Sequence, residues 1–214
     1  MRSKHGAAFA IALLVAIAGA NTVSAHRRDE LLQAARIGVA ADRIELEISL
    51  TPGIAVADEV IGAIDRDRDG VLSAEEQRAH VSLVMAATEF RIDGRIAKME
   101  MGTATYPLPG ELGDGDRSIE LRATATFPEL SPGRHELSFK NSYRSDIGVF
   151  LANALKPDSE RITIASQRRD PEQRTLVIDF TIAGNRFATL SVWLFGSGAV
   201  AWLALRRRTL PLAG

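Results

Sequence analysis

The chain has 214 residues, enough for one ordinary domain with appendages but not for two large independent cores. Its 26 basic and 27 acidic residues give a formal net charge of -1, and no long basic run interleaved with aromatic residues occurs in its middle, so nucleic-acid binding is not expected. Cysteine is absent, which excludes disulfides, thiolate nucleophiles and zinc-thiolate sites.

The first predicted element is a secretory signal peptide over residues 1–25. A positively charged start is followed by the apolar run Ala7–Ala20 and by small residues at Val23–Ala25, which suit a cleavage site. The alternative is an uncleaved membrane anchor, but the apolar run is short for a bilayer span. The mature chain would begin at His26.

Residues 26–185 are expected to form one exported domain, a mainly β, antiparallel, Ig-like β-sandwich. Arg43–Leu50 alternates strictly between polar and apolar residues, the pattern of a half-buried strand. Glu89–Met101 predicts two short strands around the turn pair Asp93-Gly94. Tyr143–Leu155 fits a strand or a docked loop and is left unassigned. Further alternating segments, separated by Pro and Gly at spacings typical of a sandwich, are Ser118–Phe127, His135–Asn141, Arg161–Ser166 and Arg174–Ile182.

Two helices, Ala55–Ile64 and Ser73–Thr88, are predicted as an insertion among these strands, and they flank an acidic loop. A hard dication takes six to eight oxygen ligands, and a tightly coiled loop can direct its alternate residues Asp65, Asp67 and Asp69 inward to supply them. Gly70 then allows a sharp turn that a side chain would hinder.

The twelve residues Asp65 to Glu76 resemble, position for position, the calcium-binding loop of the EF-hand family. The resemblance implies that Val71 offers its backbone carbonyl, that Ser73 binds directly or through a water, and that Glu76 closes the sphere with both carboxylate oxygens. The whole exported part is similar to bacterial periplasmic proteins that carry a single EF-hand in a β-domain.

The resemblance covers residues 54–88 and departs from the family pattern at Gln77, where EF-hand proteins usually place an apolar residue. Ser73 and Glu76 also form the S-x-x-E pattern of a capping box, so a metal ligand would start the second helix. Leu72 is expected to point back into the core of the hand. The apolar face of the second helix, shifted toward Val84, predicts packing against the sandwich.

EF-hands usually occur in pairs, so a second calcium loop would be expected. The best candidate, Asp114–Ser118, lacks the glycine at the sixth position and the glutamate at the twelfth, where Ile119 and Ala125 stand. The pattern of this segment is more typical of a solvated loop before a strand. The single EF-hand would be completed by the sandwich or by a second chain.

The last predicted element is a transmembrane helix over Phe187–Leu205, about 19 residues or roughly 28 Å, which matches the hydrocarbon thickness. Arg206–Arg208 follow at once and place the tail, residues 206–214, in the cytoplasm of a bacterium, with the domain outside its inner membrane. The alternatives are a buried core helix or a sorting signal that is removed after export.

The sequence therefore predicts calcium binding by a membrane-anchored binding or adaptor domain, with the ion either structural or regulatory. The alternative is an accessory subunit of a membrane metal or solute transporter. An enzyme is not expected because no nucleophile elbow, phosphate loop or His-Glu-x-x-His motif occurs. A copper site joining His26 to His80 or His135 lacks metal-ligand spacing.

Overall fold

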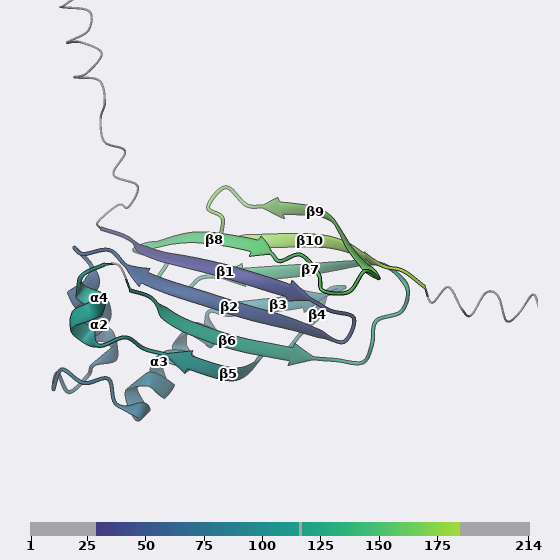
Figure 1. Ribbon diagram of the computed structural model, residues 1–214. Helices are drawn as coiled ribbons and strands as arrows, with labels where there is room; N and C mark the ends of the chain where they lie inside the picture. The colour runs from purple at the N-terminus through teal and green to yellow at the C-terminus, as the bar shows by residue number, and fades with distance from the viewer. Residues whose placement is uncertain (1–28, 116, 185–214) are drawn as a thin grey trace, which may run out of the picture.

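The computed structural model describes residues 29–115 and 117–184, and within them the fold is mainly β. Two five-stranded sheets lie one over the other (Figure 1), an arrangement compatible with the predicted β-sandwich. The first sheet has the order β5 (Glu100–Thr105), β6 (Ile119–Thr126), β2 (Arg43–Pro52), β1 (Leu31–Val39), β8 (Gly148–Ala154). The second has the order β4 (Arg95–Ile96), β3 (Thr88–Ile92), β7 (Gly133–Asn141), β10 (Thr175–Ile182), β9 (Ile162–Arg169).

The strands form because apolar residues alternate with polar ones and fill the space between the sheets. In β10 every second residue is buried, from Leu176 to Ile182. The pair Phe90 and Phe139 is fully buried with ring centroids 4.9 Å apart. Burying such a side chain stabilises the fold by about 1.5–3 kcal/mol. Most of the largest fully buried side chains come from the two sheets: Phe90, Phe139, Phe180, Leu31, Ile37, Ile44, Ile48, Leu50, Ile119 and Leu121.

Most predicted strands are confirmed within a few residues, as β2, β3, β4, β6, β7, β9 and β10. The predicted turn at Asp93-Gly94 joins β3 to β4, and both residues have positive φ, 49° and 78°. The strand β1 was not predicted, and β5 begins only at the end of the segment assigned to the short hairpin.

One strand pair departs from the predicted antiparallel arrangement. The unassigned segment contains β8, which crosses over from the other sheet and pairs with β1 in parallel, with Leu31 opposite Gly148. The remaining strand pairs of the described residues are antiparallel. The first sheet is therefore mixed.

The helices α2 (Ala57–Ile64), α3 (Ala74–Ala86) and α4 (Pro109–Gly113) lie together at one end of the sheets (Figure 1). We call α2, α3 and the loop between them the helical hairpin; it is inserted between β2 and β3. Its buried residues include Val60 and Ile64 of α2 and Val84 of α3, so it packs on the sandwich as predicted. The short helix α4, which buries Leu112, contacts α2.

The predicted signal peptide (1–25), membrane span (187–205) and cytoplasmic tail (206–214) lie outside the described residues, as does His26. Within residues 29–115 and 117–184, no helix has the length and apolar character needed to cross a membrane. The strand β10 ends at the opposite end of the sheets from the helices (Figure 1).

Gly148, the first residue of β8, is packed too closely for any side chain. A Cβ there would lie 2.6 Å from Gln33 Nε2, 2.7 Å from the Arg144 carbonyl and 2.9 Å from Phe150. We expect Gly148→Ala to destabilise the protein by about 1–3 kcal/mol. Gly62→Ala in α2 is the matched control: no atom lies within 4 Å of its Cβ, so alanine should stabilise by about 0.5–1 kcal/mol. Urea unfolding of both variants checks this; equal midpoints would contradict it.

Candidate metal site

The acidic loop joins the end of α2 to the start of α3, and both helices help to position its carboxylates. Asp65 is the C-terminal cap of α2, and Ser73 is the N-terminal cap of α3. The predicted capping box is present: Ser73 Oγ accepts a hydrogen bond from the Glu76 backbone N–H at 3.3 Å, and the Ser73 N–H donates to Glu76 Oε2 at 3.0 Å. The start of α3 therefore fixes the position of Glu76.

Three carboxylates converge in this loop. One oxygen from each of Asp65, Asp67 and Glu76 lies within 4.8 Å of the other two. Oxygen ligands at about 2.3–2.6 Å from a calcium ion can be up to about 5 Å apart, so the three oxygens fit around one dication. Among the described residues, no other group of three or more histidine, aspartate or glutamate side chains is close enough together to hold a metal ion.

Asp65 provides the strongest sign that the cluster suits a cation. Its side chain is buried, and Oδ2 accepts a hydrogen bond from the Gly70 N–H at 3.0 Å. Its other oxygen, Oδ1, is buried without a hydrogen-bond partner, and no other side-chain nitrogen or oxygen of the described residues shares this condition. A buried carboxylate oxygen without a partner is costly unless a cation or donor satisfies it. The site thus fits a bound cation.

Glu76 is held ionised by donors from both sides of the loop. The Ser73 hydroxyl donates to Oε2 at 2.7 Å, and the Arg66 N–H donates to Oε1 at 2.6 Å. These hydrogen bonds, that of the Ser73 hydroxyl above all, hold the pKa of Glu76 below its ordinary value. An ionised, nearly buried glutamate is the form that a metal ion requires.

Asp67 and Asp69 lie on the exposed side of the loop. Asp67 Oδ1 accepts from the Asp69 N–H at 3.2 Å, and Asp69 Oδ1 accepts from the Val71 N–H at 2.8 Å. The hydrogen bond from Asp69 lowers the pKa of Asp67, but desolvation and repulsion from Asp69 and Glu76 outweigh it and raise the pKa above its ordinary value. This repulsion is what a bound cation would relieve.

The structure brings together only part of the predicted ligand set. Asp65, Asp67 and Glu76 converge, whereas Asp69 bonds to the loop backbone and Ser73 bonds to Glu76. The Val71 side chain is a hydrocarbon and is exposed, so only the backbone carbonyl of this residue is a candidate ligand. Gly70 has a φ of 81°, a value that favours glycine, at the predicted sharp turn.

Gln77, which departs from the EF-hand pattern, has a local role. Its side-chain Nε2 donates to the carbonyl oxygen of Leu72 at 2.7 Å, while the Leu72 side chain is buried as predicted. Gln77 therefore satisfies a backbone carbonyl of the loop within the same chain.

We expect Gln77→Ala to destabilise the calcium-free protein by about 1 kcal/mol, because the Leu72 carbonyl loses its donor. Arg78→Ala, at the next and exposed position, is the matched control and should change stability by less than about 0.5 kcal/mol. Chemical denaturation in a calcium chelator measures both. Equal effects of the two substitutions would show that the Gln77 hydrogen bond contributes nothing.

His80, one helical turn after Glu76, anchors α3 to the sandwich through the chain's two tyrosines. Nδ1 lies 2.7 Å from the Tyr106 hydroxyl, and Nε2 lies 2.8 Å from the Tyr143 hydroxyl. Burial lowers the pKa of His80 to about 4, so it is neutral at physiological pH. Sequence reasoning missed both tyrosines because they are far from His80 along the chain.

His80 and His135, the two described candidates for a copper site with His26, have their ring nitrogens engaged elsewhere. Both ring nitrogens of His80 are engaged by tyrosine hydroxyls, and those of His135 lie 2.8 Å from Asp93 Oδ2 and 2.8 Å from the Ser131 carbonyl. His80 and His135 are not brought together in a metal-binding group. Each histidine instead links two segments of the fold.

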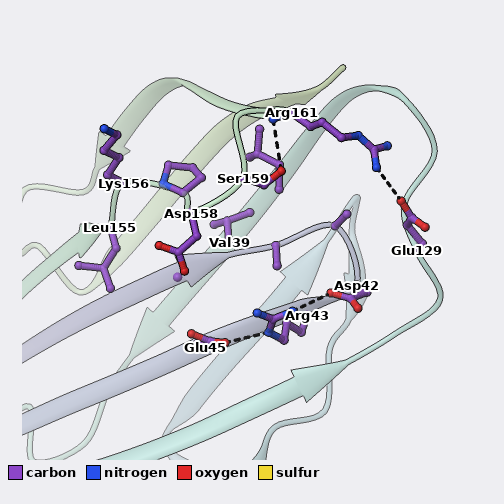
Figure 2. Close-up of a pocket in the computed structure, with 15 residues that line it drawn as sticks. Val39, Asp42, Arg43, Glu45, Glu129, Leu155, Lys156, Asp158, Ser159 and Arg161 are labelled. Carbon is purple, nitrogen blue, oxygen red and sulfur yellow. Dashed lines mark hydrogen bonds and ion pairs between the residues drawn. The ribbon is translucent and has the colours of Figure 1, made fainter. Parts of the chain in front are cut away.

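A cleft of about 350 Å³ lies at the other end of the molecule and is lined by the β1–β2 turn and the segment after β8 (Figure 2). Its charged side chains largely neutralise one another: Arg43 bonds to Glu45 at 2.8 Å, and Arg161 bonds to Glu129 at 3.3 Å. All ionisable side chains that line it are exposed. The cleft therefore lacks the buried ionisable groups typical of a catalytic site.

No family model and no curated protein matches this sequence. The resemblance to EF-hand proteins therefore rests on the residues of the loop and the two helices beside it. The converging carboxylates and the unpartnered Asp65 oxygen are independent of that resemblance.

Proposed function

We propose that this chain binds one calcium ion through the loop Asp65 to Glu76, as a single EF-hand inserted in an Ig-like β-sandwich. The observation that carries the proposal is Asp65 Oδ1, a buried oxygen without a partner beside two other carboxylates. Asp65, Asp67 and Glu76 would be the first ligands. Asp69, the Val71 carbonyl and Ser73 are close in sequence and would complete the sphere after small rotations.

Calcium is favoured by the chemistry of these donors. Every candidate ligand is an oxygen, which suits hard cations and disfavours copper and zinc sites built from imidazole or thiolate. Magnesium demands a small, nearly ideal octahedron and gives up its waters reluctantly, whereas calcium accepts more ligands in irregular geometry. A loop with carboxylates, a carbonyl and a hydroxyl fits the second requirement better.

The ion is proposed mainly as a structural staple for the helical hairpin. The chain has no cysteine and hence no disulfide, and Glu76 both caps α3 and lies in the carboxylate cluster. A ligand that binds only the folded state stabilises it by about 2.7 kcal/mol when its free concentration is a hundred times the Kd. The residues that hold the ion would then also order the start of the second helix.

We further propose that this domain is an exported, membrane-anchored binding or adaptor module. The helical hairpin lies at the opposite end of the sheets from the end of β10 (Figure 1), and strands of eight to ten residues span about 30 Å. With an anchor at 187–205, the calcium loop would face away from the membrane. This position suits a partner in the extracytoplasmic space better than a role along a transporter's path.

Equilibrium dialysis of the full chain against radiolabelled calcium, with excess magnesium present, tests the proposal. We expect one bound calcium ion per wild-type chain and none for Glu76→Ala. Asp158→Asn removes an exposed acidic side chain at the rim of the opposite cleft and should leave the stoichiometry unchanged. Equal calcium binding by wild type and Glu76→Ala would overturn the assignment of the loop.

A further inference from the structure

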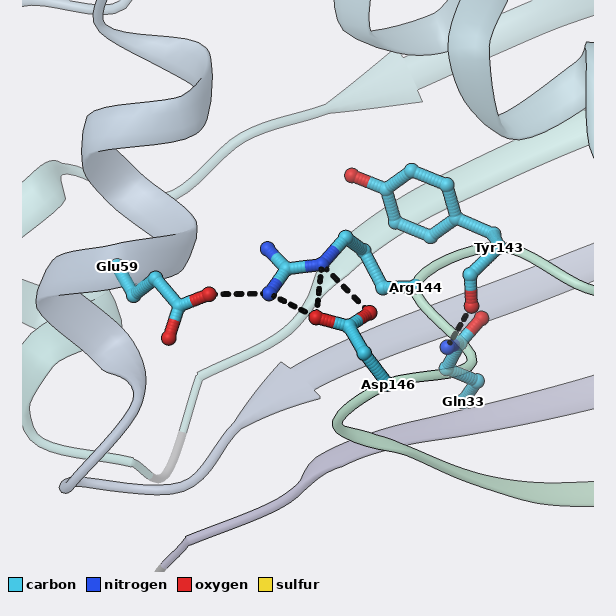
Figure 3. A network of polar contacts seen from close by, with 5 residues as sticks. All are labelled: Gln33, Glu59, Tyr143, Arg144 and Asp146. Atoms are coloured by element: carbon cyan, nitrogen blue, oxygen red, sulfur yellow. Dashed lines mark hydrogen bonds and ion pairs between the residues drawn. The ribbon is translucent and has the colours of Figure 1, made fainter.

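The turn between β7 and β8, residues 142–147, touches both helices of the helical hairpin. The Tyr143 hydroxyl lies 2.8 Å from His80 Nε2 on α3. The next residue, Arg144, makes an ion pair with Glu59 on α2 (Figure 3). Two consecutive residues of one turn therefore hold the two helices that carry the ends of the acidic loop.

This turn is built on a rigid base. The buried Gln33 of β1 donates to the Tyr143 carbonyl at 2.6 Å (Figure 3). It also accepts from the Asn141 side-chain amide at 3.0 Å. Asn141 in turn accepts from the Tyr143 N–H at 3.0 Å. Gly148 lies against the Gln33 amide with no room for a side chain. The sandwich core thus fixes the backbone from which Tyr143 and Arg144 reach the helices.

Arg144 itself has an unusual conformation that its contacts maintain. Its φ is 42°, a value that residues other than glycine and asparagine rarely adopt. Its side chain is only 20% exposed, and its guanidinium bonds to Asp146 at 2.9 and 3.0 Å as well as to Glu59. Strained backbone of this kind persists where surrounding contacts determine it. The turn is therefore specifically held, not a loose surface loop.

The separation of the two helices decides whether the carboxylates can meet. Asp65 caps the end of α2, and Glu76 lies in the first turn of α3, so neither oxygen can move far unless its helix moves. His80 follows Glu76 by four residues and hence lies on the same face of α3, one turn away. A contact that fixes His80 also fixes Glu76 relative to the sandwich.

We propose that Tyr143 and Arg144 are positioning residues of the ion site, which hold α3 and α2 at the separation that brings Glu76 and Asp65 together. The inference rests on the proposed calcium function. Because coupling between two sites is reciprocal, ion binding must order residues 142–147 by the same free energy with which this turn improves ion affinity. The surface formed by this turn is then linked to ion occupancy.

Calorimetric and hydrogen-exchange measurements on the full chain in mild detergent test this inference. Glu59→Gln removes the ion pair at an exposed helix position, and Tyr143→Phe removes one hydroxyl while keeping the ring. We expect each to raise the Kd for calcium about three- to tenfold. Arg161→Gln breaks a comparable surface ion pair, with Glu129, at the other end and should leave the Kd unchanged.

Amide hydrogen exchange distinguishes a positioning role of this turn in the ion site from an effect on the stability of the whole fold. In wild type, calcium should slow exchange in residues 142–147, and this protection should shrink in Glu59→Gln even at saturating calcium. If wild type binds calcium but neither the variants' Kd nor the exchange of this turn changes, the inference is overturned while the proposed function stands. If wild type binds no calcium, both are lost.

Discussion

Asp65→Asn is expected to stabilise the calcium-free protein and to abolish its stabilisation by calcium. Without an ion, the asparagine amide can donate to the neighbouring carboxylates of Asp67 and Glu76, and the unpartnered oxygen of Asp65 is gone. Removing one charge and satisfying one buried group should raise the free energy of unfolding by about 1 kcal/mol. At free calcium a hundred times the wild-type Kd, the wild type should gain about 2.7 kcal/mol and the variant nothing.

Urea unfolding in a calcium chelator and at free calcium a hundred times the wild-type Kd measures this reversal. Asp158→Asn, far from the loop, is the control and should follow the wild type in both conditions. If Asp65→Asn were less stable than wild type in the chelator, the unpartnered oxygen of Asp65 would not cost the calcium-free protein stability. If it were more stable in both, the acidic cluster would not bind calcium at all.

His80 should make the protein sensitive to acid. Its pKa is lowered by burial to about 4 in the folded state, against 6.5 when unfolded, so protonation favours the unfolded chain. Above pH 6.5 the histidine is neutral in both states and stability does not depend on it. As the pH falls from 6.5 to 4, about 3 kcal/mol of stability should be lost, and the loss should level off below pH 4.

The difference between wild type and His80→Gln in free energy of unfolding, measured from pH 7.5 to 4, isolates this contribution. The comparison is needed because His135 acts in the opposite direction. Burial lowers the pKa of His135, but its hydrogen bonds to Asp93 and the Ser131 carbonyl outweigh this and raise it, so His135 adds stability at acidic pH. A pH-independent difference between wild type and His80→Gln would contradict the burial of a neutral His80.

The loop and its helices could be predicted because their determinants are local. The capping box of Ser73 and Glu76, the positive φ at Gly70 and the burial of Leu72 each depend on residues within a few positions of one another. Strands such as β2 and β10 could be predicted for the same reason, since their inward residues are apolar and their outward residues are mainly polar.

The strand β1 escaped prediction because its two faces do not differ in polarity. Gln33 points inward and is buried, and its side-chain amide is satisfied by hydrogen bonds to Tyr143 and Asn141. The outward positions Leu32 and Ala34 are apolar. β8 has the same ambiguity, with Val149 and Leu151 on its exposed face. Which side of such a strand is buried depends on its partners in space.

The contacts that brace the ion site are likewise long-range. Glu59 and Arg144 are 85 residues apart, and His80 and Tyr143 are 63 residues apart. Nothing in the spacing of these residues marks them as partners. They become neighbours only because β8 crosses between the sheets after β7, which places the connecting turn against both helices.

Calorimetric titration of the full chain with calcium tests the central claim most directly. The account predicts saturable heat with one site per chain, weaker or absent heat with magnesium, and no calcium heat for Glu76→Ala, which loses a converging carboxylate. An absence of calcium heat for the wild type at millimolar calcium, with the protein shown to be folded, would contradict it.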